Sequence, residues 1–160
     1  MDSYDIFTYS AVSNGLHAIA AVIWVGGMFF AHMALRPSVA VLEPPQRLAL
    51  WAGVFPRFFR WVWVSIVVLF ATGLGTVFID FGGFGGTPVH VHLMLTVSLV
   101  MLAVYATIYF GPFRAFMARV AARDWPAAAE AQAVIRKLVA TNLVLGLLTV
   151  AIGAAGRFWG

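Results

Sequence analysis

The stretch 16-LHAIAAVIWVGGMFFAHMALRP-37 decides the fold of this chain. A run of about 20 apolar residues is the length that a helix needs to cross a bilayer. Histidine is uncommon inside such a run and marks a candidate functional site, and this run contains His17 and His32. On a straight α-helix, Trp24 and Met28 fall within about 20° of His17. One stripe of this span therefore carries most of its polar and metal-binding side chains.

Composition places the chain among integral membrane proteins. Of its 160 residues, 62% are hydrophobic and 10% are charged, and the mean hydropathy is +0.94. In soluble domains about a quarter of the residues are charged. The sequence has no cysteine, which excludes disulfides, thiolate metal sites and cysteine nucleophiles. The pI near 10.1 does not indicate nucleic-acid binding, because the ten basic residues lie in connections or near the ends of apolar runs.

Four apolar runs and the absence of any strand pattern predict an all-α integral membrane protein, folded as an antiparallel bundle of four transmembrane helices. Pro44-Pro45 prevents a continuous helix through the connection between the first and second spans. Pro88 is placed to start the third span, and a helix that starts near Asp124 continues unbroken into the fourth. We expect one domain, residues 1–160, with spans at about residues 14–35, 61–79, 89–110 and 138–155.

The basic residues predict the orientation in the membrane. Arg157 is the one basic residue expected on the side of the termini. The positive-inside rule therefore puts both termini and the glycine-rich loop outside, and the other two connections in the cytoplasm. The basic residues of those connections and the adjacent span edges are Arg36, Arg47, Arg57, Arg60, Arg114, Arg119, Arg123, Arg136 and Lys137.

Histidines at one depth suggest a haem site. In this orientation His17 lies about one turn inside the outer end of span one, and His90 and His92 lie in the first turn of span three. These parallel spans can lie diagonally opposite, about 12–14 Å apart, a gap that two imidazoles and an iron would fill. Glycine is also common at ordinary helix interfaces in membranes. The flanking spans carry glycines at this depth, namely Gly73, Gly75, Gly146, Gly153 and Gly156.

We therefore predict haem b held by His17 and His92 near the outer face, for electron transfer or oxidation of a small substrate. His90 and His92 cannot both point inward on a helix, and His92 is deeper by about 3 Å. His90 is then expected to contact a propionate or face water, unless an extended segment makes the two a chelating pair for copper. Arg157 pairs with a propionate or snorkels to the headgroups. Trp24 is a further cofactor contact or a core residue.

A copper-handling protein is the alternative hypothesis. Thioether and imidazole ligands suit Cu(I), although methionine also fills irregular cores without binding metal. A haem needs two histidines at one depth, whereas a transport path needs ligands at successive depths. A third hypothesis is a structural subunit of a larger membrane complex. In every case we expect a lipid bilayer around the chain, an unidentified redox partner if it carries electrons, and an oligomer or larger complex. The candidate copper ligands of the alternative hypothesis are Met28, His32 and Met33 on span one, and Met94 and Met101 on span three.

Two short motifs resemble known families. The pattern LHxxAxxxWxGG at residues 16–27, with the Arg36-Pro37 exit, resembles the start of the copper-resistance protein D (CopD) family of bacterial membrane proteins. The stretch at residues 136–158, with Arg136 and Asn142, resembles the last span of that family. A first-span histidine and an Arg…Asn element also resemble the HemJ-type protoporphyrinogen oxidases, which carry a lysine where this chain has His92. The first resemblance implies copper handling in the bacterial inner membrane, and the second implies haem b and porphyrin chemistry.

Overall fold

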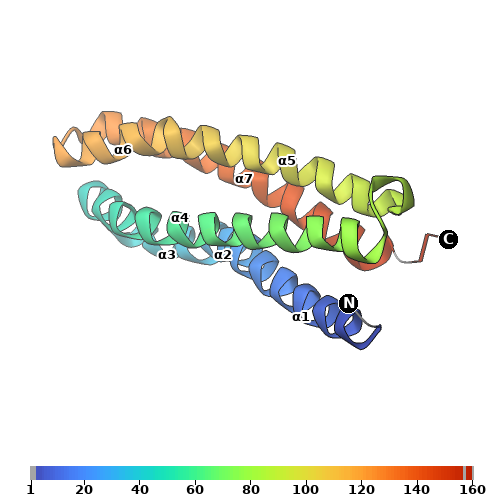
Figure 1. Cartoon of the computed structure of the whole chain (residues 1–160). Coiled ribbons are helices and arrows are strands. Elements are labelled where there is room, and N and C mark those ends of the chain that lie inside the picture. Colours follow the sequence, from blue (N-terminus) through green and yellow to red (C-terminus); the bar gives the residue numbers. More distant parts are fainter. Residues whose placement is uncertain (1–2, 157, 160) are drawn as a thin grey trace.

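A computed structural model describes residues 3–156 and 158–159 of the chain. Within these residues the chain forms helices and no strand, and four helical rods are long and apolar enough to cross a membrane. Figure 1 shows the rods lying alongside one another, with both ends of the chain on the same side. The predicted all-α membrane bundle is therefore confirmed. The rods are Phe7–Val41, Pro44–Asp80, Val89–Ala121 and Trp125–Gly156.

The first rod is not one regular α-helix. A π-helical turn holds an extra residue, so side chains beyond such a turn leave the stripe expected on a straight helix. Trp24 and Met28 are accordingly buried, each with 2% of the side chain exposed, whereas His17 is half-buried. The rod consists of α1 (Ser3–Ala21), the π-helix η1 (Val22–Gly26), α2 (Gly27–Phe30), the π-helix η2 (Ala31–Leu35), α3 (Arg36–Ser38) and the 3-10 turn η3 (Val39–Val41).

The second rod begins earlier than the expected second span. It consists of α4 (Pro44–Gly75) followed directly by the π-helix η4 (Thr76–Asp80). Pro44-Pro45 occupies the first turn, where the missing N–H would have no helical partner. The amphipathic segment of residues 47–60, which precedes the expected span at 61–79, is therefore in the first half of the same helix.

The third and fourth rods are regular. α5 (Val89–Phe110) follows Pro88, and α6 (Pro112–Ala121) follows at Gly111. α7 (Trp125–Gly156) runs unbroken from the connection through the fourth span. The Asp124 carboxylate accepts a hydrogen bond from the Ala127 N–H at 3.2 Å, which satisfies one free donor of the first turn. The loop between η4 and α5 contains the short 3-10 turn η5 (Phe84–Gly86).

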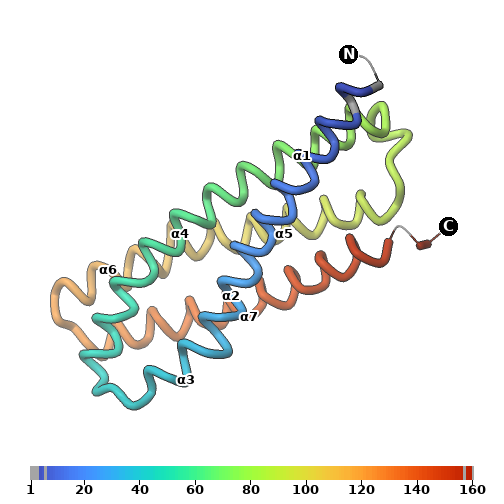
Figure 2. Tube along the Cα trace, turned by 90° about the horizontal axis from the view of Figure 1, so that it is seen from below, coloured from blue at the N-terminus to red at the C-terminus, as the bar shows by residue number. Residues whose placement is uncertain are grey.

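The rods pack as two pairs that are in contact at one end and near the middle of the bundle. α1 packs on α4, and α5 packs on α7, while η1 and α2 contact α7 near the middle of the bundle. Figures 1 and 2 both show α1 diverging from α5 and α7 toward the N-terminus. The arginine-bearing end is thus the closed end of the bundle.

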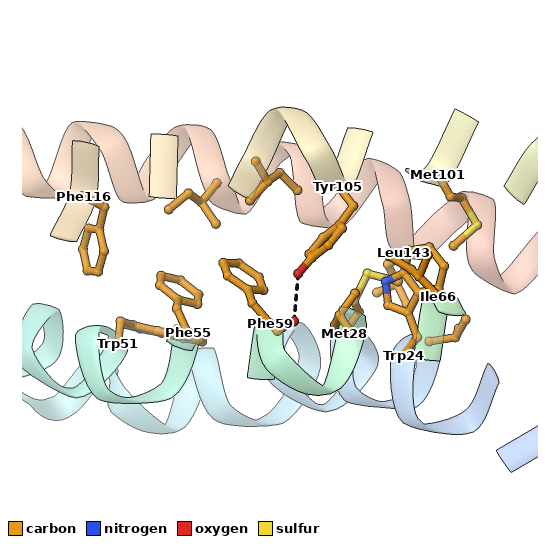
Figure 3. Packing of buried hydrophobic residues seen from close by; sticks show 14 of the residues in the cluster. Trp24, Met28, Trp51, Phe55, Phe59, Ile66, Met101, Tyr105, Phe116 and Leu143 are labelled. Atoms are coloured by element: carbon orange, nitrogen blue, oxygen red, sulfur yellow. Dashed lines mark hydrogen bonds between the residues drawn. The ribbon is translucent and has the colours of Figure 1, made fainter. Parts of the chain in front are cut away.

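An aromatic cluster joins the two pairs at the closed end. Phe55 and Phe59 stack along α4 with their ring centroids 5.5 Å apart, and Phe116 of α6 meets Phe55 edge-on at the same distance. The Tyr105 hydroxyl of α5 donates to the Phe59 carbonyl at 2.8 Å. Figure 3 shows these rings filling the space between the two pairs.

Candidate functional site

His17 lies between α1 and α4. Its Nδ1 is 2.7 Å from the Thr72 hydroxyl, and its Cε1 would be 3.5 Å from a β-carbon on Gly73. The hydroxyl of Thr72 donates to the Val68 carbonyl at 2.7 Å. The ring therefore lies beside Gly73 of α4, and Thr72 fixes its orientation.

The proton count at Thr72 assigns the tautomer of His17. A hydroxyl has one proton, and the Thr72 proton is used on the Val68 carbonyl. The Nδ1 of His17 therefore donates to the Thr72 oxygen, which leaves a lone pair on Nε2. A lone pair on one imidazole nitrogen with a held N–H on the other is the arrangement found in metal-ligating histidines.

Ser13 and Thr96 each lie four residues from a predicted ligand, but neither side chain bonds to that ligand's ring. Ser13, one turn before His17, is buried, but its hydroxyl has no hydrogen-bond partner among the described residues. The Thr96 hydroxyl donates to the backbone carbonyl of His92 at 2.9 Å and not to its ring. Thr72 on the neighbouring helix holds the His17 ring instead, and a contact across 55 positions of sequence leaves no local pattern.

His92 lies against the loop between η4 and α5. Its Nε2 is 3.1 Å from the Phe84 carbonyl, and its ring lies 6.2 Å from the Phe84 ring. A carbonyl only accepts hydrogen bonds, so Nε2 carries the proton and donates. This bond ties the first turn of α5 to η5.

The described geometry does not support haem between His17 and His92. His17 contacts α4, whereas His92 contacts Phe84, and their helices pack on different partners. The Nε2 of His92 is also occupied by a carbonyl. The described residues contain no group of three or more His, Cys, Asp or Glu side chains that could hold a metal ion. Arg157, the predicted propionate partner, lies outside the described residues.

His90 packs against α7. A β-carbon on Gly156 would clash with the His90 side chain, and the His90 ring meets Trp159 edge-on at 6.4 Å. His90, which is half-buried, therefore makes a helix–helix contact with α7. The ring enters the interface because the residue opposite has no side chain.

Two methionines continue the contact of His90 along the same face of α5. A β-carbon on Gly153 would lie 2.8 Å from Met94 Cε, and one on Gly146 would lie 3.1 Å from Met101 Cε. The Thr149 hydroxyl, which donates to the Leu145 carbonyl, lies 3.8 Å from the Met101 sulfur. We call these three ligand-type side chains of α5, His90, Met94 and Met101, the soft seam.

The first rod contributes one more buried thioether, Met28, at the Met101 end of the soft seam. Met28 and Met101 each have 2% of the side chain exposed, and both belong to the same core cluster. Figure 3 shows Met28, Trp24 and Met101 gathered at one end of that cluster. Trp24 meets the Tyr105 ring edge-on at 6.2 Å, so Trp24 is a core residue here. Met33 has 58% of its side chain exposed and lies outside the cluster.

A signal for the soft seam is present in the sequence. Met94 and Met101 are seven residues apart, and so are Gly146 and Gly153. Equal spacing on two antiparallel helices permits each methionine to face one glycine. His90 belongs to the same face but had been assigned to a propionate or to water.

Comparison with known proteins gives a family. The profile described as "Copper resistance protein D" matches residues 52–155. An uncharacterized protein of Aquifex aeolicus (strain VF5) is 27% identical over 143 residues, which cover 89% of this chain and 91% of that protein. No solved structure matches the chain. The matched residues include most of α4 and all of the soft seam.

Proposed function

Because the chain belongs to the copper resistance protein D family, and is thus a multi-pass bacterial membrane protein, we propose that it moves or holds Cu(I) within the membrane. The soft seam is the observation that carries this proposal. Imidazole and thioether groups are the ligands that suit Cu(I) in a chain without cysteine. In this proposal copper is the cargo of the protein.

The depths of the ligands favour a path over a single closed site. Along α5 a residue rises about 1.5 Å, so His90 and Met101 are separated by roughly 16 Å, about half of a hydrocarbon core. Met28 would receive the ion from Met101, and His32 lies one turn further along the first rod. The glycines opposite the ligands let the side chains of α5 pack directly against α7.

Removal of the Met101 sulfur tests the path. Met101→Leu keeps the volume and the apolar character of the side chain, and we expect it to slow Cu(I) entry into proteoliposomes by about tenfold or more. The measurement is the response of a Cu(I) sensor trapped inside. Met33→Leu is the matched control, since it removes a lipid-facing sulfur. Equal rates for the wild type and both variants, or a purified protein with a haem spectrum and no bound copper, would reject the copper path.

His17 is a further proposed copper ligand, separate from the soft seam. Its Nε2 lone pair is free of the Thr72 bond, and α1 diverges from α7 at this level (Figure 2). An ion from the outer side would therefore meet His17 between α1 and α4 and His90 between α5 and α7. These would be two separate entry ligands.

We also propose that both termini lie outside the inner membrane. The distribution of arginines supports this orientation. Alkaline phosphatase fused after Gly160 is expected to be active, because it folds only outside the cytoplasm. The same fusion placed in the connection after α6 should be inactive. Activity of the second fusion alone would reverse the orientation.

A further inference from the structure

A cavity of about 350 Å³ lies at the arginine-bearing end, between the first rod, α4 and α7. Three arginines from three elements line it, namely Arg36 of α3, Arg47 of α4 and Arg136 of α7. Among the described residues, no acidic side chain lines this cavity. The ion pair found among the described residues joins Arg119 and Asp124, and neither of them lines the cavity. The cavity is therefore strongly positive.

The inner wall of the cavity is aromatic. Trp51 and Phe55 stack with their ring centroids 4.9 Å apart, and Phe55 stacks on Phe59 at 5.5 Å. Figure 3 shows these rings in a row along α4. Because the rings hold one another in place, the wall is preformed. His32 and Gln132 add polar groups to the lining of the cavity.

Arginines at this end of a membrane protein normally set orientation and face water. Several arginines outside the cavity have partners within the chain. Arg57 donates to the Gly53 carbonyl at 2.6 Å, and the Arg114 guanidinium lies 5.1 Å from the centre of the Phe110 ring. The guanidinium groups of the three arginines of the cavity make no hydrogen bond or ion pair with the described residues. Their guanidinium groups are thus available to a ligand.

We propose that this cavity binds an anionic amphiphile, a molecule with a phosphate or carboxylate head and an apolar body. Guanidinium groups bind both heads through paired, charge-assisted hydrogen bonds. The aromatic wall covers the apolar body, as in pockets of about 300–1,000 Å³ that bind small molecules. A phospholipid of the adjacent leaflet and a soluble amphiphile present this same chemistry.

Two binding assays distinguish the sources. In the lipid assay, the protein is reconstituted with equal amounts of phosphatidylglycerol and phosphatidylcholine, and native mass spectrometry measures which lipid stays bound. In the soluble assay, octyl phosphate is titrated onto protein in phosphatidylcholine nanodiscs. The readout is the change in tryptophan fluorescence on binding. The part of this change that comes from Trp51 is the part that is absent in Trp51→Phe. We expect saturable, anion-selective binding in at least one assay.

Two double variants, each with two charges removed from α4 and α7, decide whether the cavity is the site. Arg47→Gln with Arg136→Gln removes two charges from the cavity, and we expect binding to weaken about tenfold or more. Arg60→Gln with Lys137→Gln removes two charges outside it and should leave binding within about twofold. Equal loss in both double variants would overturn the proposal, because it would reveal unspecific attraction. Equal retention of both lipids without octyl phosphate binding would overturn it as well.

Discussion

Replacement of Gly146 by valine is expected to destabilise the bundle by about 3 kcal/mol, the upper part of the range for overpacked cores. A β-carbon at this position would lie 2.9 Å from a methyl group of Val25 and 3.1 Å from Met101 Cε. These neighbours belong to η1 and to α5, so a larger side chain at position 146 would press against two elements at once. Unfolding in mixed micelles of dodecyl maltoside and increasing dodecyl sulfate measures the change.

Two other glycines are controls for Gly146→Val. A β-carbon on Gly15 would meet nothing within 4 Å, so Gly15→Ala should be neutral or stabilise its helix by about 0.5–1 kcal/mol. Gly153 faces the flexible end of Met94, and Gly153→Ala should cost less than Gly146→Ala because that end can rotate away. Equal stability of Gly146→Val and the wild type would show that α7 is not seated between η1 and α5.

Replacement of Thr72 by valine is expected to weaken Cu(I) binding at His17 by about 10–100-fold, the usual effect of losing the group that orients a metal-binding imidazole. Valine has the shape of threonine but accepts no hydrogen bond. The Nδ1 of His17 then loses its partner, and the ring is free to rotate or to move its proton to Nε2. Thr72→Ser keeps the hydroxyl and should restore most of the affinity. Thr72 would thus be a positioning residue.

Two measurements separate this effect from a general loss of structure. Competition with a chromophoric Cu(I) chelator gives the affinity, and NMR of ¹⁵N-labelled histidine reports which ring nitrogen carries the proton. Thr107→Val is the matched control, because the Thr107 hydroxyl bonds only to the backbone carbonyl one turn earlier, at 2.9 Å. If His17→Ala binds Cu(I) as tightly as the wild type, His17 is not a ligand.

The elements of the fold follow closely from local signals in the sequence. Pro88 marks the start of α5, and Asp124 marks the start of α7, because both residues act on the first turn of a helix. The length of α4 was underestimated, since arginines in the amphipathic segment resemble those of a connection. The π-helices η1, η2 and η4 have no such signal. An extra residue in a turn changes few local contacts, yet it rotates everything that follows.

The candidate site was less predictable because it depends on contacts between helices. A helical wheel puts Met94 and Met101 on one face, but only the packing of α5 on α7 gives that face its glycine partners. The diagonal pairing of His17 with His92 assumed a symmetric bundle. The divergence of α1 from α5 and α7 removes that symmetry, and the histidines find partners on α4 and in the loop between η4 and α5.

Because the rods are longer than the hydrocarbon core is thick, the position of the protein depends on the thickness of its membrane. The second rod has 37 residues, roughly 55 Å at 1.5 Å per residue, against a hydrocarbon core of about 30 Å. If the loop between η4 and α5 lies at one membrane surface, the surplus projects from the other surface at the closed end. Because the aromatic cluster stiffens that end, hydrophobic mismatch would be met by tilting and by sliding along the normal. A thicker bilayer would draw the cavity deeper into the acyl chains, and a thinner one would lift it into the headgroups.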